Sequence, residues 1–163
     1  MHIKLINKYL YFEEYKVKCA IGKRGISSFK KEGDLATPRG QFKFTHLFYR
    51  KDKISSIETS FKKIPIKKNM GWCDDPRSKY YNKFVTFPFK QKAEKLYLKN
   101  NLYDIILVTN YNQNPTIKRK GSAIFLHITT KKYLPTRGCV AITEKDFKLL
   151  LKKINKKTLL KIY

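Results

Sequence analysis

Residues 121–154 read GSAIFLHITTKKYLPTRGCVAITEKDFKLLLKKI, and this stretch decides the fold. It contains two short apolar runs, Ala123–Ile128 and Cys139–Ile142, each of the length that is typical of a buried strand. Thr143 then begins a capping box with Asp146, and apolar residues follow at helical spacing. Those apolar residues are Phe147, Leu150, Leu151 and Ile154. The stretch predicts two strands followed by a helix that packs one face on their sheet.

Further segments outside this stretch have the composition of strands, rich in β-branched and aromatic residues. They are Tyr15–Ile21, Phe42–Tyr49, Leu102–Thr109 and Leu159–Tyr163. A weaker helix is predicted over Gln91–Lys99, with Leu96 and Tyr97 as its apolar contacts. The pattern favours an α+β fold that is mostly β, with mainly antiparallel strands and one or two helices. Because no repeat or low-complexity linker divides the 163 residues, we expect one domain, 1–163.

Two regions hold most of the glycine and proline and are predicted to be loops. The first, Gly22–Gly40, ends in Thr37-Pro-Arg-Gly40, whose proline and glycine fit a type I turn. The second, Asn69–Asn82, has the length of a binding loop or a lid. The residues that would contact substrate there are Trp72, Asp74, Asp75, Tyr81 and Asn82. The alternative is a loop held together by its own aromatic and turn residues.

The charge of the chain is strongly positive: 37 Lys+Arg and 12 Asp+Glu give +25. Such a charge attracts polyanions, among them nucleic acid, anionic lipid surfaces and acidic wall polymers. The lysines are spread along the chain rather than clustered, so a general bias of composition is the alternative explanation. Residues 1–12 lack the apolar core of a signal peptide, and no apolar run approaches the length of a membrane span. We therefore expect neither an export signal nor a transmembrane segment.

The three cysteines, Cys19, Cys73 and Cys139, include no C-x-x-C pair, so a disulfide framework is not expected. Cys139 is the one that follows a glycine at the start of an apolar run. Of the three histidines, His2 lies near a terminus that we expect to be loosely held, and His46 alternates with apolar residues in a predicted strand. Both are therefore expected to be structural or exposed.

His127 differs, because it stands at the end of an apolar run and twelve positions before Cys139. A histidine delivered by a buried strand can take the proton of a thiol, and the resulting thiolate is a strong nucleophile. A backbone carbonyl or a nearby hydroxyl would orient the other ring nitrogen. Two alternatives remain: a buried cysteine beside a core histidine, and a metal site, for which no ligand pair has zinc-site spacing.

The segment from His127 to Val140 resembles the active-site signature of L,D-transpeptidases of the YkuD type, in which a histidine precedes a Ser/Thr-x-Gly-Cys element. Thr136, Gly138 and Cys139 fall on that element. Other parts of the chain are also similar to this family, over roughly residues 17–150. They are Gly22–Gly25, Lys31–Asp34, Thr37–Phe42, Gly71–Pro76 and Gly121–His127, of which the last two resemble a small stand-alone subgroup.

The resemblance implies a β-sandwich or barrel-like sheet, with Cys139 as the nucleophile and His127 as the general base. No metal or other cofactor is implied. The amide of Gly138 would help to stabilise an oxyanion. Ser122, Tyr133 and Thr136 are the further candidates for the substrate pocket.

Two positions depart from the family pattern. Arg137 stands where the family commonly has histidine, and Ala141 stands where it often has arginine. Arg137 can supply the missing positive charge, by lowering the thiol pKa or by gripping a substrate carboxylate. The alternative is a solvated turn residue.

The substrate that the resemblance implies is the peptidoglycan stem peptide, cleaved after diaminopimelate through a thioester on the enzyme. The acceptor is left open: another stem's amine gives a cross-link, a D-amino acid gives exchange, and water gives carboxypeptidase activity. Cleavage elsewhere in the stem, as by an endopeptidase, is also open. We expect a monomer in the cell envelope, although the lack of a signal peptide leaves the cytoplasm as the alternative.

Functions from other classes are a non-catalytic wall-binding domain and a nucleic-acid-binding module. The first is suggested by the departures at Arg137 and Ala141. The second needs a basic face interleaved with stacking aromatic residues. The chain has no zinc finger or RNA-binding signature, and most aromatics occupy strand positions suited to a core. Nucleic acid is therefore not an expected partner.

Overall fold

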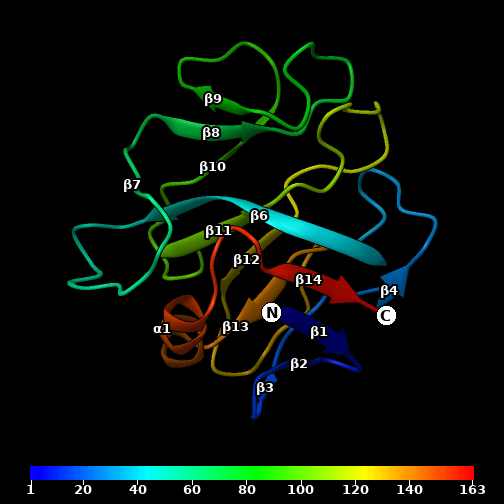
Figure 1. The fold of residues 1–163 in the computed structure, drawn as a ribbon. Helices are drawn as coiled ribbons and strands as arrows, with labels where there is room; N and C mark the ends of the chain where they lie inside the picture. The colour runs from blue at the N-terminus through cyan, green and yellow to red at the C-terminus, as the bar shows by residue number, and fades with distance from the viewer.

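The computed structural model describes residues 1–163 and contains one helix among many short strands (Figure 1). In chain order the elements are β1 His2–Ile6, β2 Tyr9–Phe12, β3 Tyr15–Lys18, β4 Ile26–Ser27, β5 Thr37–Pro38, β6 Gly40–Tyr49, β7 Lys63–Pro65, β8 Met70–Cys73, β9 Phe84–Thr86, β10 Ala93–Lys95, β11 Ile105–Thr109, β12 Phe125–Ile128, β13 Val140–Ile142, α1 Glu144–Lys153 and β14 Leu159–Ile162. Most strand pairs are antiparallel, which confirms the predicted α+β class with a dominant β component.

The main sheet has nine strands and curls almost into a barrel. Its order is β13-β12-β11-β6-β14-β1-β2-β3, with β7 added beside β6. The two ends of this order meet, because Ala20, just after β3, and Ala141 on β13 exchange backbone hydrogen bonds of 2.8 and 2.9 Å. The predicted barrel-like sheet is thus confirmed, and β13 lies where the sheet closes.

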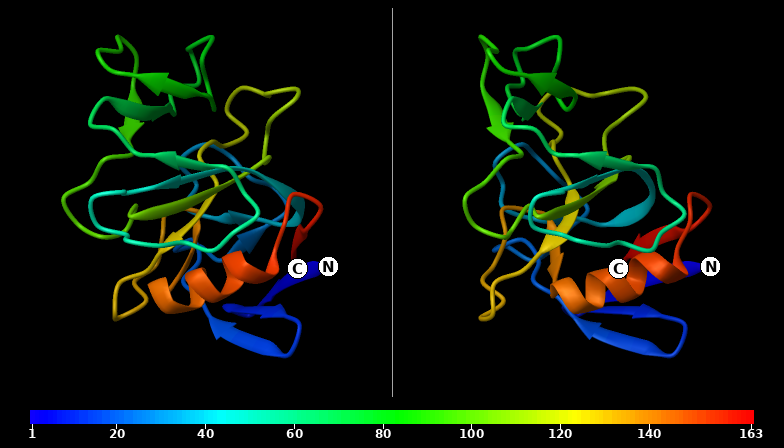
Figure 2. Two further views of the ribbon diagram at one scale, coloured as in Figure 1. Left: turned by 60° about the vertical axis from the view of Figure 1, so that its left-hand side comes forward. Right: turned by 90° about the vertical axis from the view of Figure 1, so that its left-hand side faces the viewer.

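Strands β11 and β12 are buried on both faces and separate two apolar cores. Ile105 and Leu107 of β11 belong to the core that α1 covers, whereas Ile106 and Val108 belong to the other. A small sheet of order β10-β8-β9 packs over the second core through Trp72. Figure 2 shows α1 and this small sheet at opposite ends of the molecule. Odd-numbered residues of β12 therefore face the small sheet.

The helix is confirmed as predicted. The Thr143 hydroxyl accepts a hydrogen bond from the Asp146 amide at 3.1 Å and caps the first turn. Phe147, Leu150 and Leu151 are fully buried against the main sheet. No helix in the structure is both long and apolar enough to span a membrane.

All the predicted strands are present, most of them shorter than expected, but a second helix is not. Residues Ala93–Lys95 form strand β10 instead, which pairs with β8. The segment is extended because its Leu96 amide bonds to the Met70 carbonyl at 3.0 Å. With one fully buried residue, Leu96, it lacks the apolar stripe that would hold a helix on the core.

Three further expectations were wrong. Thr37–Pro38 is a strand that pairs with β4, so Thr37–Gly40 is extended rather than a type I turn. The segment Asn69–Asn82 is not all loop, because Met70–Cys73 is strand β8. The N-terminus is not loosely held: β1 lies between β14 and β2, and Ile3 and Leu5 are fully buried by the strand's alternating pattern.

Candidate active site

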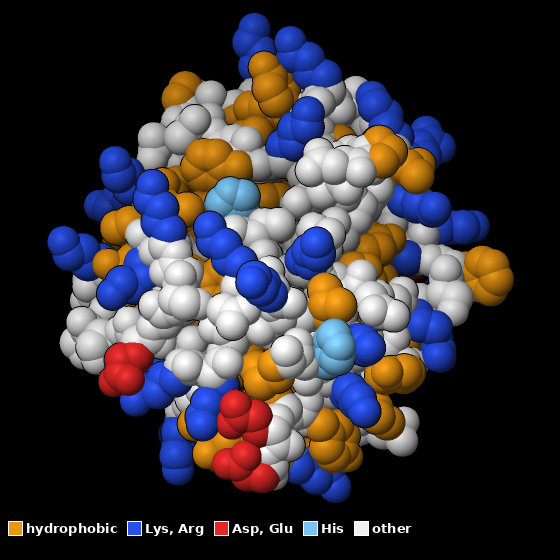
Figure 3. Space-filling view, in the orientation of Figure 1, with side chains coloured by type: hydrophobic (Ala, Val, Ile, Leu, Met, Phe, Trp, Pro, Cys, Tyr) orange, Lys and Arg blue, Asp and Glu red, His pale blue; other side chains and the backbone are white.

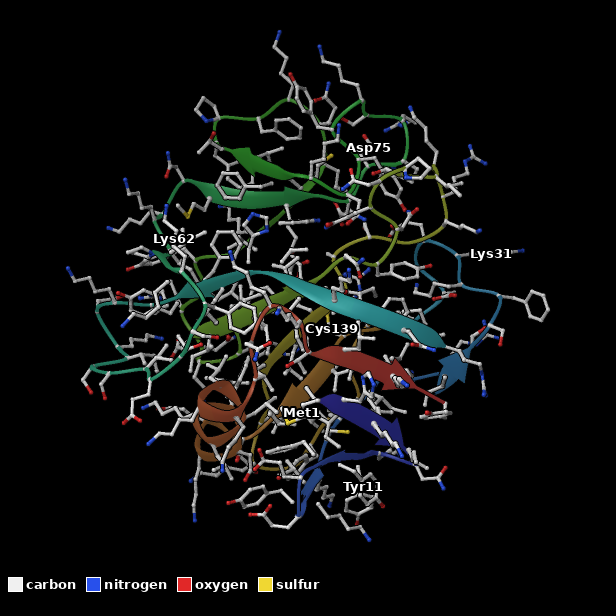
Figure 4. The ribbon with its side chains drawn as sticks, in the orientation of Figure 1. Met1, Tyr11, Lys31, Lys62, Asp75 and Cys139 are labelled. Carbon is white, nitrogen blue, oxygen red and sulfur yellow. The ribbon has the colours of Figure 1, made fainter.

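Strands β12 and β13 bring Cys139 and His127 to the same face of the sheet. The two strands pair in parallel, with His127 beside Ala141. Two residues earlier on each strand, the Cys139 sulfur accepts a hydrogen bond from the Phe125 amide at 3.4 Å. Side chains two positions apart on a strand share a face, so the His127 ring lies on the side of β12 where the thiol lies. Figure 4 labels Cys139 near the middle of the molecule.

The loop before Cys139 is fixed by threonine side chains. The Thr136 hydroxyl donates to the Cys139 carbonyl at 2.6 Å and accepts from the Gly138 amide at 3.1 Å. The buried Thr37 hydroxyl donates to the Gly138 carbonyl at 2.9 Å and accepts from the Gly22 amide at the same distance. The N-terminal segment that resembles the family therefore holds the loop that carries the cysteine.

Gly138 is required for the path of this loop. Its φ of +137° is unfavourable for other residues, and a Cβ there would lie 2.9 Å from the Ala36 carbonyl oxygen. Its amide is occupied by Thr136, so it does not point at an oxyanion as expected. The backbone amide of Cys139 has no hydrogen-bond partner within the protein and can therefore donate to an oxyanion.

The Cys139 thiol is buried and neutral. It donates to the Ala123 carbonyl at 3.1 Å. Burial, and then the nearby negative charge of Glu94, raise the pKa of the thiol to about 12. A resting thiolate is therefore not formed near neutral pH, and any nucleophilic role of this sulfur requires a base that removes the proton.

The ring of His127 is oriented by a backbone carbonyl. Its Nδ1 lies 2.8 Å from the Ile128 carbonyl oxygen. A carbonyl only accepts, so Nδ1 carries the hydrogen and Nε2 is left as the basic nitrogen. Burial lowers the pKa of the imidazole to about 4, which keeps it neutral. The ring of Tyr103 packs edge-on against it with centroids 5.3 Å apart.

A cavity of about 550 Å³ opens onto both side chains. It lies between β12 and the small sheet, and the loop of residues 134–137 forms another wall. Of the predicted pocket residues, Asp74, Ser122, Thr136 and Arg137 line it together with Cys139 and His127.

Other predicted site residues lie outside the cavity lining. Tyr133 is half-buried and has a positive φ of 50°, and the Lys18 ammonium lies 4.8 Å above its ring. Asp75 is in the upper part of the molecule in Figure 4, apart from Cys139. Its carboxylate accepts from the Arg77 amide at 3.0 Å and so shapes a turn. Neither side chain reaches the thiol.

Trp72, Tyr81 and Asn82 support the site from behind. The Trp72 indole donates to Asn82 at 3.0 Å, and the same Asn82 oxygen accepts from the Ala123 amide at 3.0 Å. The Tyr81 hydroxyl donates to Glu32 and accepts from the Gly121 amide. All three are buried. Only the hydrogen bond from Trp72 to Asn82 lies within the segment, whereas the others join it to Glu32, Gly121 and Ala123, so the segment is not held by its own contacts alone.

Sequence reasoning missed the polar wall of the cavity. Glu94 accepts a hydrogen bond of 2.6 Å from the hydroxyl of Tyr103, and both line the cavity with Lys30. Lys30 forms an ion pair of 2.6 Å with Asp34. The misassigned helix over 91–99 hid Glu94, and no motif of the sequence marked Tyr103. The alternation of a strand around Glu94 was the only available signal.

Comparison with known proteins agrees with this geometry. The family model described as the L,D-transpeptidase catalytic domain, YkuD, matches residues 6–162. A search of curated proteins finds no match. Members of the matched family are typically enzymes that act on peptidoglycan, and they are usually associated with the cell wall. The arrangement around Cys139 and the match over nearly the whole length lead to one conclusion: the chain belongs to the YkuD family of L,D-transpeptidase catalytic domains.

Proposed function

We propose that residues 1–163 form one catalytic domain that acts as a cysteine-dependent L,D-transpeptidase on peptidoglycan stem peptides. The observation that carries the proposal is a buried thiol and a neutral imidazole on one face of β12, both open to the same cavity. The donor is a tetrapeptide stem, cleaved after diaminopimelate with release of D-alanine. The cell envelope is the proposed location, in keeping with the family.

The first half of the reaction forms a thioester. The sulfur of Cys139 turns from the Ala123 carbonyl toward Nε2 of His127, which takes the thiol proton as sulfur bonds to the donor carbonyl carbon. The Cys139 amide stabilises the resulting oxyanion. When the C–N bond breaks, the imidazolium returns its proton to the leaving amine.

The second half resolves the thioester. An acceptor amine attacks the same carbonyl carbon and loses its proton to His127, and the thiolate leaves and is reprotonated. With water as acceptor the enzyme is an L,D-carboxypeptidase, and cleavage at another stem bond makes it an endopeptidase of the same fold. Transpeptidation is the reaction we propose, in keeping with the family match.

Arg137 is proposed to bind a carboxylate of the stem peptide. It is exposed and lines the cavity, and none of the ion pairs in the structure uses it. A guanidinium can hold a carboxylate through two parallel hydrogen bonds.

A basic groove is proposed to bind acidic wall polymers. It has a volume of about 960 Å³ and meets the cavity at Lys30 and Glu32. Its exposed basic side chains are Lys31, Arg77, Arg119 and Lys120. Lys31 is labelled on its loop in Figure 4. Elsewhere the basic side chains are scattered over the surface, as one face shows (Figure 3).

The proposal is tested by incubating the protein with a disaccharide-tetrapeptide and following products by mass spectrometry. We expect loss of D-alanine together with a cross-linked dimer, and neither product with Cys139→Ala. The conservative control is Cys73→Ala, a buried cysteine that does not line the cavity and is expected to retain activity. Equal binding of the peptide by wild type and Cys139→Ala, with no turnover in either, would instead favour a non-catalytic wall-binding domain.

A further inference from the structure

The cavity beside Cys139 carries as many acidic as basic side chains, three of each, in a chain that is otherwise strongly basic. The whole sequence has 12 Asp+Glu, and Glu32, Asp74 and Glu94 lie among the 22 residues that line this one cavity. Glu32 accepts hydrogen bonds from the hydroxyls of Tyr81 and Ser122. The composition of the chain gives no reason for this concentration of carboxylates, so the cavity itself has to explain it.

Glu94 differs from Asp74, another carboxylate of the cavity, in having no ion pair. Asp74 forms an ion pair of 3.2 Å with Lys92 through Oδ2, while its buried Oδ1 has no hydrogen-bond partner. Glu94 has one hydrogen bond, from Tyr103 to Oε1, and takes part in no ion pair. Its second oxygen, Oε2, has no partner within the protein. Burial raises the pKa of Glu94, which means that its charge is stabilised less than it would be in water.

Arg137, on the other wall of the cavity, is the positively charged side chain that complements Glu94. The two side chains form no ion pair, although the charge of Arg137 acts on the titration of both Glu94 and Tyr103. The cavity therefore presents one carboxylate and one guanidinium that are not neutralised by each other. An amino-acid headgroup, with an ammonium and a carboxylate on one carbon, has the complementary pair of charges.

We propose that Glu94 is a specificity-determining residue that binds the ammonium of a zwitterionic side-chain terminus in the stem peptide, while Arg137 binds its carboxylate. This inference rests on the proposed function. It selects a third residue whose side chain ends in an amino-acid group, as diaminopimelate does, over lysine, which offers an ammonium alone. Oε2 of Glu94 accepts the ammonium, and the hydrogen bond from Tyr103 holds Oε1 in place.

A purely structural role for Glu94 is the competing explanation, since Tyr103 links it to the His127 ring. The two roles differ in one property. A ligand to the ammonium responds to the charge of the substrate amine, whereas a support for Tyr103 does not. Glu94→Gln separates them, because the amide has the same shape and keeps an oxygen that can accept from Tyr103.

The experiment measures binding by calorimetry in the Cys139→Ala background, where no turnover interferes. Two tetrapeptides are compared, one with the free side-chain amine of diaminopimelate and one with that amine acetylated. We expect the protein with Glu94 to prefer the free amine by about tenfold or more, the range of a charge-assisted hydrogen bond. Glu94→Gln should abolish the preference, and the matched control Glu58→Gln should keep it, because Glu58 is exposed and lies outside the cavity lining.

An equal preference in the Glu94→Gln variant, no preference in either protein, or no binding of either peptide would overturn the inference. Its failure is distinguishable from failure of the proposed function. Turnover by the protein that retains Cys139, without an amine preference, leaves the transpeptidase proposal standing and removes the role of Glu94. An amine preference in binding without any turnover would support the role of Glu94 and contradict the transpeptidase proposal.

Discussion

Burial keeps the two central side chains of the candidate site uncharged. The pKa of Cys139 is raised to about 12 and that of His127 is lowered to about 4, in each case chiefly by burial. A preformed thiolate and imidazolium pair is therefore absent at neutral pH. In the proposed mechanism, proton transfer between the two accompanies attack on the substrate, so the reactivity of the thiol is coupled to the presence of a bound carbonyl.

The lowered pKa of His127 predicts a loss of stability in acid. An unfolded histidine titrates near 6.5 and the folded one near 4, so between these values the unfolded state binds more protons. The contribution of His127 is complete above pH 6.5 and falls by about 3 kcal/mol as the pH drops to 4. Denaturant unfolding of wild type and His127→Asn across this range measures it.

The variant should show a weaker decline in the free energy of unfolding than wild type. His46→Asn is the control, because His46 is exposed on β6, and it should retain most of the decline. If His127→Asn loses stability with pH as steeply as wild type, the ring is not held neutral by burial.

At the scale of elements, the pairing of β12 with β13 and the strand β5 together set the position of the nucleophile. Thr37 on β5 joins the Gly22 amide to the Gly138 carbonyl through one buried hydroxyl. Thr37→Val keeps the shape and removes both hydrogen bonds, which leaves two buried polar groups unsatisfied. We expect the free energy of unfolding to fall by about 3 kcal/mol and kcat to fall with it.

Thr86→Val is the matched control, because Thr86 is exposed on β9 and its hydroxyl makes no hydrogen bond within the protein. It should change neither stability nor turnover. Normal stability and turnover in Thr37→Val would show that the cysteine loop is positioned by other contacts.

Local sequence patterns predicted those elements correctly whose conformation depends on their own residues alone. The helix after Thr143 was recognisable because its cap and its apolar stripe agree. The segment 91–99 was not, because its extended form depends on pairing with β8, which no local pattern encodes. In the site, their places at the ends of apolar runs made Cys139 and His127 candidates only, and the resemblance to the YkuD signature singled them out. Glu94 reaches the cavity only when the small sheet folds over β12.

At the scale of the whole molecule, the charge of +25 can attract polyanions either over the whole surface or at one site. The proposed function places polyanion binding in the basic groove. Removing two lysines of the groove, in Lys31→Ser with Lys120→Ser, should weaken binding of poly(glycerol phosphate). It should also lower the salt dependence of log K by roughly two, since each lost phosphate contact releases one counterion fewer.

The matched control removes two exposed lysines from another part of the surface, in Lys62→Ser with Lys68→Ser. Figure 4 labels Lys62 and Lys31 on opposite sides of the molecule. Equal weakening in both double variants would assign the binding to the overall charge. Stronger binding to duplex DNA than to the polymer would identify nucleic acid as the partner of the groove.

The central claim is that Cys139 forms a thioester with the stem peptide. Intact-protein mass spectrometry after a brief incubation with the tetrapeptide and an acid quench tests it directly. The account predicts one adduct, with the mass of the donor less D-alanine, located on Cys139 by peptide mapping and absent from Cys139→Ala. Product formation without an adduct on Cys139, or an unchanged rate in Cys139→Ala, would contradict it.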